Sequence, residues 1–190
     1  MNLYDILNAV VTNMIYIFLD FDGVINNWNS NNCVSPENVM VLKKILKKTD
    51  AKIVVTSSNK YSLQIKESYD YYLSKFYREY IKPLNDFGIE IYDITPYVNG
   101  NRTLEIEKYL LDNEVRNYVI IDDELVGASL QEHQVFLDLY KGLQDEHIEP
   151  TLKILNGDLG FYPNDYDRSE TPKQLNYRIN KYHNSLKNKD

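Results

Sequence analysis

A short apolar run near the start of the chain ends on two acidic residues. Residues 14–19 are Met-Ile-Tyr-Ile-Phe-Leu, and Asp20, Asp22 and Gly23 follow directly. A run this short and this rich in Ile, Tyr and Phe is typical of a strand buried on both faces, and side-chain alternation predicts that both acids point the same way. Like charges so close repel each other unless a divalent cation neutralises them or they divide the roles of nucleophile and proton donor. The alternative is a pair of solvated turn acids before Gly23.

Two later apolar runs also end on polar side chains. These are Asp122 and Asp123 after residues 118–121, and Thr56, Ser57 and Ser58 after residues 52–55. In open α/β sheets, ligands bind beyond the carboxyl ends of parallel strands, so these three strand ends are predicted to converge on one site. Four carboxylates and nearby hydroxyls suit a hard cation with a phosphate. Oxygen ligands favour Mg²⁺, which one or two carboxylates usually hold together with phosphate oxygens of a substrate.

Strand and helix patterns alternate along the chain. Besides the three runs above, we expect strands at 88–93 and 135–138. The expected helices are one after Ser35-Pro36 to Lys48, one or two over 60–81 ending at Pro83, one from Arg102, and a segment to Leu155 disturbed by Pro150. This alternation predicts an α/β fold with a doubly wound, Rossmann-like parallel sheet and helices on both faces.

Length and composition fit one cytoplasmic domain. At 190 residues, we expect a domain over 1–155, with an N-terminal helix at 1–13, a helical insertion at 60–82, and a loop and helix at 156–190 packed on it. Cys33 is the single cysteine, which rules out an intramolecular disulfide framework and is typical of a reducing interior. No stretch approaches the length of a membrane helix, so no membrane partner is expected. The oligomeric state stays open.

The motifs at the strand ends resemble those of the haloacid dehalogenase-like (HAD) superfamily. Phe18-Leu-Asp-Phe-Asp-Gly-Val is similar to its first motif, Ile53-Val-Val-Thr-Ser-Ser to its second and Val119-Ile-Ile-Asp-Asp to its fourth. The third motif is a Lys or Arg near the start of a helix, which Arg102 matches best, with Lys108 as the fallback. Over roughly residues 15–155 the chain is similar to the HAD domains of Swiss-army-knife RNA repair proteins. The Ser-Ser-Trp-Arg of that family is Ser57-Ser58-Asn59-Lys60 here.

The resemblance implies a HAD-like catalytic domain with a minimal cap, acting as a Mg²⁺-dependent phosphatase through an aspartyl-phosphate. The implied roles are nucleophile for Asp20, general acid and base for Asp22, phosphate hydrogen-bond donor for Thr56 or Ser57, and charge neutralisation for Arg102. The implied holders of Mg²⁺ are Asp20, Asp22 through its backbone carbonyl, and Asp122, with Asp123 positioning the metal or its water.

The substrate is left open by the sequence. The repair-protein likeness and a minimal cap favour a phosphorylated polynucleotide end, whereas a net charge of −7 favours a small phosphate ester or nucleotide, or help from a protein partner. A polynucleotide would need a local basic rim, for which the candidates are Lys60, Lys66, Arg78 and Arg102, and Trp28 could stack on a base.

Two other classes of function are compatible with paired acids at strand ends. A catalytically idle, metal-binding regulatory module would have no need of both Asp20 and Asp22, which are intact. A receiver domain phosphorylated by a kinase expects a Lys on a late strand, whereas the late strand here closes on Asp138. The enzyme interpretation is therefore favoured.

Overall fold

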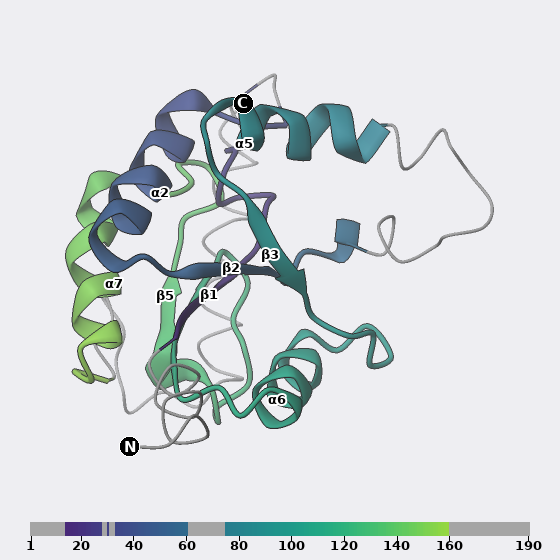
Figure 1. Cartoon of the computed structure of the whole chain (residues 1–190), viewed down its shortest axis with the longest axis vertical. Helices are drawn as coiled ribbons and strands as arrows, with labels where there is room; N and C mark the ends of the chain where they lie inside the picture. Colours follow the sequence, from purple (N-terminus) through teal and green to yellow (C-terminus); the bar gives the residue numbers. More distant parts are fainter. Residues whose placement is uncertain (1–13, 28–29, 31–32, 61–74, 160–190) are drawn as a thin grey trace, which may run out of the picture.

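The structure is a computed structural model, and it describes residues 14–27, 30, 33–60 and 75–159. Within this part of the chain, five strands form one parallel sheet in the order β3-β2-β1-β4-β5, with β1 at its centre (Figure 1). The strands are β1 (Ile15–Leu19), β2 (Lys52–Val55), β3 (Ile91–Ile94), β4 (Asn117–Asp122) and β5 (Gln134–Phe136). The predicted Rossmann-like α/β fold is confirmed.

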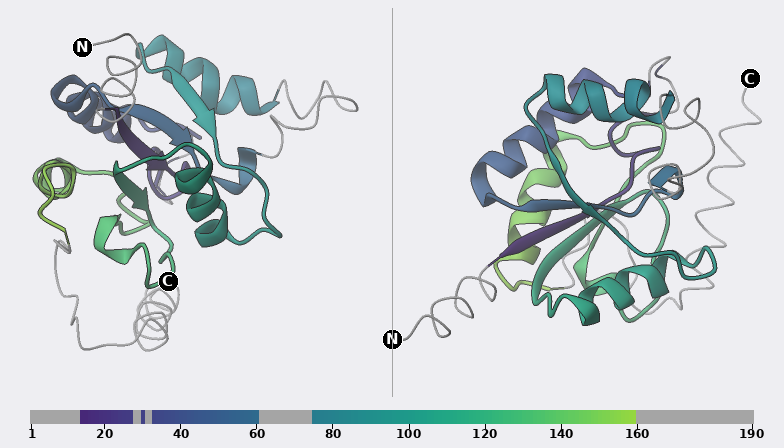
Figure 2. Two further views of the ribbon diagram at one scale, coloured as in Figure 1. Left: turned by 60° about the horizontal axis from the view of Figure 1, so that its bottom comes forward. Right: turned by 45° about the vertical axis from the view of Figure 1, so that its right-hand side comes forward.

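Helices cover both faces of the sheet. The helical elements are α2 (Pro36–Thr49), α5 (Lys82–Asp86), α6 (Arg102–Asp112) and α7 (Ile148–Leu155), a π-helical turn η2 (Tyr77–Ile81), and the 3₁₀ turns η1 (Ser58–Lys60), η3 (Gln131–His133) and η4 (Asp145–His147). The first hydrophobic cluster joins α2, η2, α5 and α7 to one face, and the second joins α6 to the other. Figures 1 and 2 show α2 and α7 side by side, away from α6.

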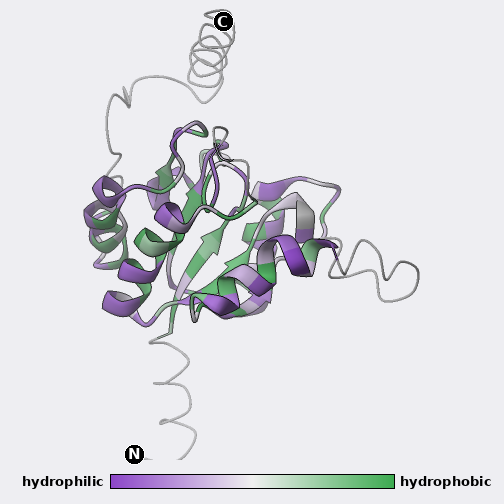
Figure 3. Cartoon of the chain, turned by 90° about the horizontal axis from the view of Figure 1, so that it is seen from above, coloured by the Kyte–Doolittle hydropathy of each residue, from purple (hydrophilic) through white to green (hydrophobic). Residues whose placement is uncertain are grey.

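The side chains of β1 alternate between these two clusters. Ile17 and Leu19 belong to the first cluster, while Tyr16 and Phe18 belong to the second, and all four are buried. In Figure 3 the strands are hydrophobic and the surrounding helices carry hydrophilic residues. This explains the continuous apolar run in the sequence, because a central parallel strand with helices on both sides has no polar face.

The direction of strand addition reverses beside β1. From β1 the chain adds β2 and β3 toward one edge, and β4 then pairs with the other side of β1, with β5 beyond it. Ligands of open α/β sheets bind at the carboxyl ends of the strands where the order reverses. Here that place is defined by Asp20, which follows β1, and Asp122, which closes β4.

Two expectations about proline are wrong. Pro83 does not end its helix, because residues 75–86 are helical without a break. The π-helical turn directly before it widens the backbone, and such a turn relieves the clash between a proline ring and the preceding turn. Pro150 lies in the first turn of α7, where its missing N–H would have no partner within the helix.

Several expectations concern residues outside the described part of the chain. These are the helix over 1–13, the stacking role of Trp28, the basic residue Lys66, most of the insertion over 60–82, and the loop and helix from residue 160 to 190.

Helix α2 begins and ends close to its predicted bounds, with Ser35 in the N-cap position and Pro36 first, although the Ser35 side chain makes no capping hydrogen bond.

Candidate active site

Three aspartates gather where β1 and β4 end. One carboxylate oxygen from each of Asp20, Asp122 and Asp123 lies within 4.8 Å of the others. Asp20 and Asp122 are neighbours because β1 and β4 pair in register through Leu19 and Ile121, and the Asp20 N–H extends the pairing by donating to the Ile121 carbonyl at 3.1 Å. The predicted meeting of these two strand ends is confirmed.

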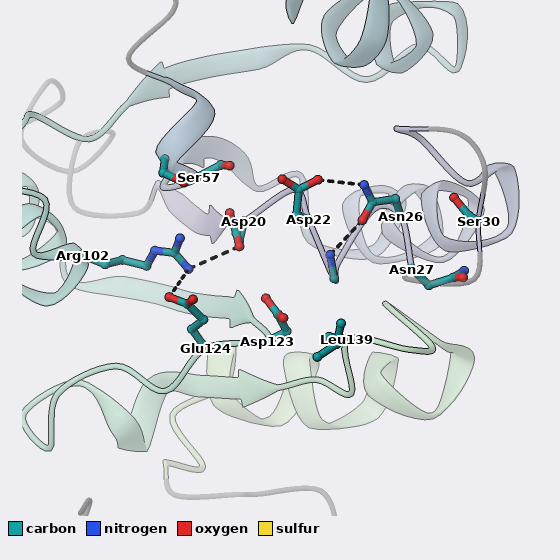
Figure 4. Close-up of a pocket in the computed structure, with 12 residues that line it drawn as sticks. Asp20, Asp22, Asn26, Asn27, Ser30, Ser57, Arg102, Asp123, Glu124 and Leu139 are labelled. Carbon is teal, nitrogen blue, oxygen red and sulfur yellow. Dashed lines mark hydrogen bonds and ion pairs between the residues drawn. The ribbon is translucent and has the colours of Figure 1, made fainter. Parts of the chain in front are cut away.

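Arg102 enters the site from α6, on the face of the sheet toward which the acids point. Side-chain alternation places Asp20 and Asp122 on the α6 side of the sheet, and Arg102 is the first residue of α6. Its Nη1 lies 2.7 Å from both carboxylate oxygens of Asp122. The same atom lies 3.3 Å from Oδ2 of Asp20 and 3.6 Å from Glu124 (Figure 4). The predicted third-motif residue therefore contacts both acids, while Lys108 is exposed and pairs with Asp112 at 2.8 Å.

Burial makes the acid cluster costly to ionise. Burial is the largest cause that raises the pKa of Asp20 and Asp122, and it raises the pKa of Asp123 to about 7 with a further contribution from Asp20. Burial opposes the charge of Arg102, but Asp122 and Asp20 outweigh it and raise its pKa, so the guanidinium stays charged. One cation thus faces three clustered carboxyl groups, an arrangement that a divalent ion would complete.

Gly23 is the point at which the β1 loop meets Asp123. Its φ is +73°, and a Cβ built on it would lie 2.5 Å from Cγ of Asp123. Any side chain here would push the Asp123 carboxylate out of the cluster, so the close approach of the backbone requires glycine. The glycine of the Asp-Phe-Asp-Gly sequence is therefore explained by packing against an acid from β4.

Asp22 does not follow the strand periodicity that the sequence predicts. The strand ends at Leu19, and the Phe21 carbonyl accepts from the N–H groups of Val24 and Ile25, which places Asp22 in a turn. Its carboxylate is exposed and lies outside the group of three acids, although it lines the same pocket as Asp20. The predicted common orientation of Asp20 and Asp22 is wrong, because the period of two applies only while the backbone is extended.

The hydroxyl residues after β2 differ in whether they line the pocket. Ser57 and Ser58 line the pocket, whereas Thr56 is buried, does not line it, and has an Oγ1 with no hydrogen-bond partner among the described residues. Lys60, expected on a basic rim, is fully buried, and its Nζ lies 2.6 Å from Glu105 and 3.1 Å from the Thr56 carbonyl. It joins the loop after β2 to α6 and offers no charge to solvent.

The pocket is acidic on one side and neutral on the other. Its lining residues are Asp20, Asp22, Gly23, Asn26, Asn27, Ser30, Ser57, Ser58, Arg102, Asp123, Glu124 and Leu139. Figure 4 shows Arg102 and Glu124 at one end and Asn26, Asn27 and Ser30 at the other. Among these lining residues Arg102 is the one cation, and Arg78 is exposed on η2 without lining the pocket.

Sequence reasoning missed several polar contacts of the site. Tyr80 and Asn26 each donate to Asp22 at 2.9 Å, and Glu124 lies beside Arg102. Asn26 and Glu124 stand next to recognised motifs, so their proximity in the chain was a usable signal. Tyr80 lies 58 residues from Asp22 in a segment predicted only to be helical, and no local pattern indicates its contact. Asp93, in β3, accepts from the Tyr109 hydroxyl and does not line the pocket.

A doubly wound parallel sheet with an acid pair after its central strand, and a second acid pair with a basic helix residue beside it, defines a HAD-type hydrolase. The sequence pattern of the family described as "HAD domain in Swiss Army Knife RNA repair proteins" matches residues 16–148, and the chain belongs to this family. No curated protein and no solved structure gives a significant match. Among the described residues, no helix combines the length and apolar character needed to cross a membrane.

Proposed function

We propose that this chain is a Mg²⁺-dependent phosphatase that works through an aspartyl-phosphate on Asp20. The observation that carries the proposal is the meeting of Asp20, Asp122 and Asp123 within 4.8 Å beside Arg102. Buried acids this close need a cation to neutralise them. Asp20 also lines a pocket to which Ser57 contributes a hydroxyl donor.

In the proposed reaction, a carboxylate oxygen of Asp20 attacks phosphorus while the bond to the leaving oxygen breaks. Arg102 and Ser57 line the same pocket as Asp20 and would stabilise the negative charge on the phosphoryl oxygens. Asp22 gives its proton to the leaving oxygen. Asp22 then takes a proton from water as the water oxygen binds phosphorus and the bond to Asp20 breaks, which returns both acids to their starting state.

The residues present fit a divalent ion. Besides the cluster itself, Oδ1 of Asp20 is buried and accepts no hydrogen bond among the described residues. Asp20, Asp122 and Asp123 would hold the ion, together with the backbone carbonyl of Asp22. When bound, Mg²⁺ would neutralise the carboxylates and draw negative charge from the phosphoryl oxygens.

The family supports a phosphorylated polynucleotide end as the substrate. A small phosphate ester is the second candidate, and a specific observation favours it: Lys60 is buried, and Arg102 is the one cation among the described lining residues. The effect of salt on the rate of hydrolysis distinguishes the two candidate substrates. A polynucleotide end held by several cations should be hydrolysed much more slowly at high salt, whereas hydrolysis of a small ester should scarcely change. Equal salt responses would favour the small ester.

The proposal is tested by Asp20→Asn, which removes the nucleophile with little change of shape. Turnover of phosphate monoesters with Mg²⁺ should fall by orders of magnitude, and no phosphoenzyme should form. The matched control is Asp145→Asn, which changes an exposed acid paired with Lys44 and should keep wild-type rates. Activity of Asp20→Asn within about tenfold of wild type would refute the mechanism.

The metal is tested without relying on activity. Millimolar Mg²⁺ should raise the melting temperature of the wild type, because the ion binds the folded acid cluster and not the unfolded chain. The increase should be largely lost in Asp122→Ala, which removes a fully buried member of the cluster, and kept in Asp145→Asn. Identical melting curves with and without Mg²⁺ would contradict the metal site.

A further inference from the structure

The carboxylate of Asp22 is held by two donors from different parts of the chain. Nδ2 of Asn26 and the hydroxyl of Tyr80 each lie 2.9 Å from Oδ1 of Asp22. Asn26 is itself fixed, because its Oδ1 accepts from the Gly23 N–H at 2.8 Å. Asp22 is exposed on a turn, so these contacts restrict the rotation of its side chain.

Tyr80 is placed by aromatic packing against the first motif. The Phe21 ring stacks on Tyr80 with centroids 5.2 Å apart and on Phe76 at 5.8 Å, and Phe76 contacts Tyr80 at 5.2 Å. All three rings are buried in the first cluster. Phe21 is the residue between Asp20 and Asp22, so the catalytic loop itself fixes the ring whose hydroxyl reaches Asp22.

The hydroxyl of Tyr80 comes from the π-helical turn η2. Such turns are rare and are found frequently at functional sites. The Tyr80 hydroxyl donates to Oδ1 of Asp22 at 2.9 Å, and its ring is fixed by the stack with Phe21. The turn therefore presents a fixed donor to an otherwise exposed acid.

We propose that Tyr80 is a positioning residue for proton transfer by Asp22, with Asn26 as its second support. The inference rests on the proposed phosphatase function and adds to it. A carboxylate oxygen has two lone-pair directions, and the two donors use both on Oδ1. The two donors thereby hold the Asp22 carboxyl group in the orientation from which it gives a proton to the leaving oxygen in the first step and takes a proton from water in the second.

This role predicts a dependence on the leaving group. An alkyl phosphate has a basic leaving oxygen that needs a proton as it departs, whereas a nitrophenyl phosphate has a leaving group that departs unaided. The ratio kcat/KM covers the steps up to release of this group. A loss of Asp22 alignment should therefore lower kcat/KM for the alkyl ester and leave the nitrophenyl ester nearly unchanged.

The experiment measures kcat/KM of Tyr80→Phe with Mg²⁺ on both esters. The change keeps the stacked ring and removes one hydroxyl. We expect a fall of about tenfold or more for the alkyl phosphate, part of the range that general acid catalysis contributes, and less than about twofold for the nitrophenyl phosphate. The matched control is Tyr77→Phe, on the same turn but half exposed and away from the pocket, which should match wild type on both esters.

The outcomes separate this inference from the proposed function. Wild-type rates on both esters, or an equal fall on both, would overturn the role of Tyr80 while leaving the phosphatase intact. A wild type that hydrolyses neither ester nor any phosphorylated oligonucleotide would instead overturn the proposed function. If Tyr80→Phe fails to fold, Asn26→Ala removes the other donor to Oδ1, and the same selective fall is expected.

Discussion

Replacement of Gly23 by alanine tests the close approach on which the acid cluster depends. The added Cβ would meet the Asp123 carboxylate, with 2.5 Å to Cγ and 2.6 Å to Oδ2. The alanine would also have to adopt a φ of +73°, a left-handed conformation that is unfavourable for residues with a side chain. Asp123 can escape only by turning away from Asp20 and Asp122, so the substitution should affect both stability and the cluster.

The expected loss has two parts. A left-handed conformation costs an alanine about 1–2 kcal/mol, and crowding a packed site costs typically about 1–3 kcal/mol more. Gly23→Ala should therefore lower the free energy of unfolding by about 2–5 kcal/mol. The control is Gly100→Ala, because Gly100 has a similar φ of +68° and a Cβ added there would meet no described atom within 4 Å. Gly100→Ala should therefore lose only the part that comes from the left-handed conformation.

The assay is urea denaturation of both variants, followed by melting curves with and without Mg²⁺. Gly23→Ala should lose more stability than Gly100→Ala and should lose most of the stabilisation by Mg²⁺, which Gly100→Ala keeps. In an Asp123→Ala background the excess loss of Gly23→Ala should largely disappear, because the clashing atoms are gone. Equal losses for the two glycine variants, with equal responses to Mg²⁺, would refute the reasoning.

Two further predictions concern buried charge. Lys60→Met should destabilise the fold by about 3–5 kcal/mol, because it removes the cation that neutralises the buried Glu105 carboxylate. Adding Glu105→Gln should recover part of the loss in the same urea assay, and a double variant worse than Lys60→Met would contradict this. Without metal, the Asp123 pKa of about 7 lies above its unfolded value of 3.8, so its contribution to stability is full at low pH and falls as the pH rises through this window. With chelator present, Asp123→Asn should therefore gain on the wild type by about 2 kcal/mol between pH 5 and 7, and a constant difference would argue against the raised pKa.

Local sequence patterns predicted most of the fold. The apolar runs before Asp20, Thr56 and Asp122 identified three central strands, because a parallel strand covered on both faces has to be apolar throughout. The N-cap position of Ser35 and the start of α6 at Arg102 were also predicted, since helix ends depend on residues close in sequence. The expectation for Pro83 was wrong, because the effect of this proline depends on the π-helical turn before it.

The sequence by itself determined which residues are the candidates for the chemistry, because the strand ends and the acids that follow them occupy consecutive positions. Only the tertiary structure decided how they meet. The order of the strands set Asp122 beside Asp20, the turn after Leu19 turned Asp22 away from the acid cluster, and burial withdrew Lys60 from solvent into a pair with Glu105. Tyr80 reached Asp22 through ring packing across the fold. Such contacts join residues far apart in the chain, so they depend on packing and leave no periodic trace in the sequence.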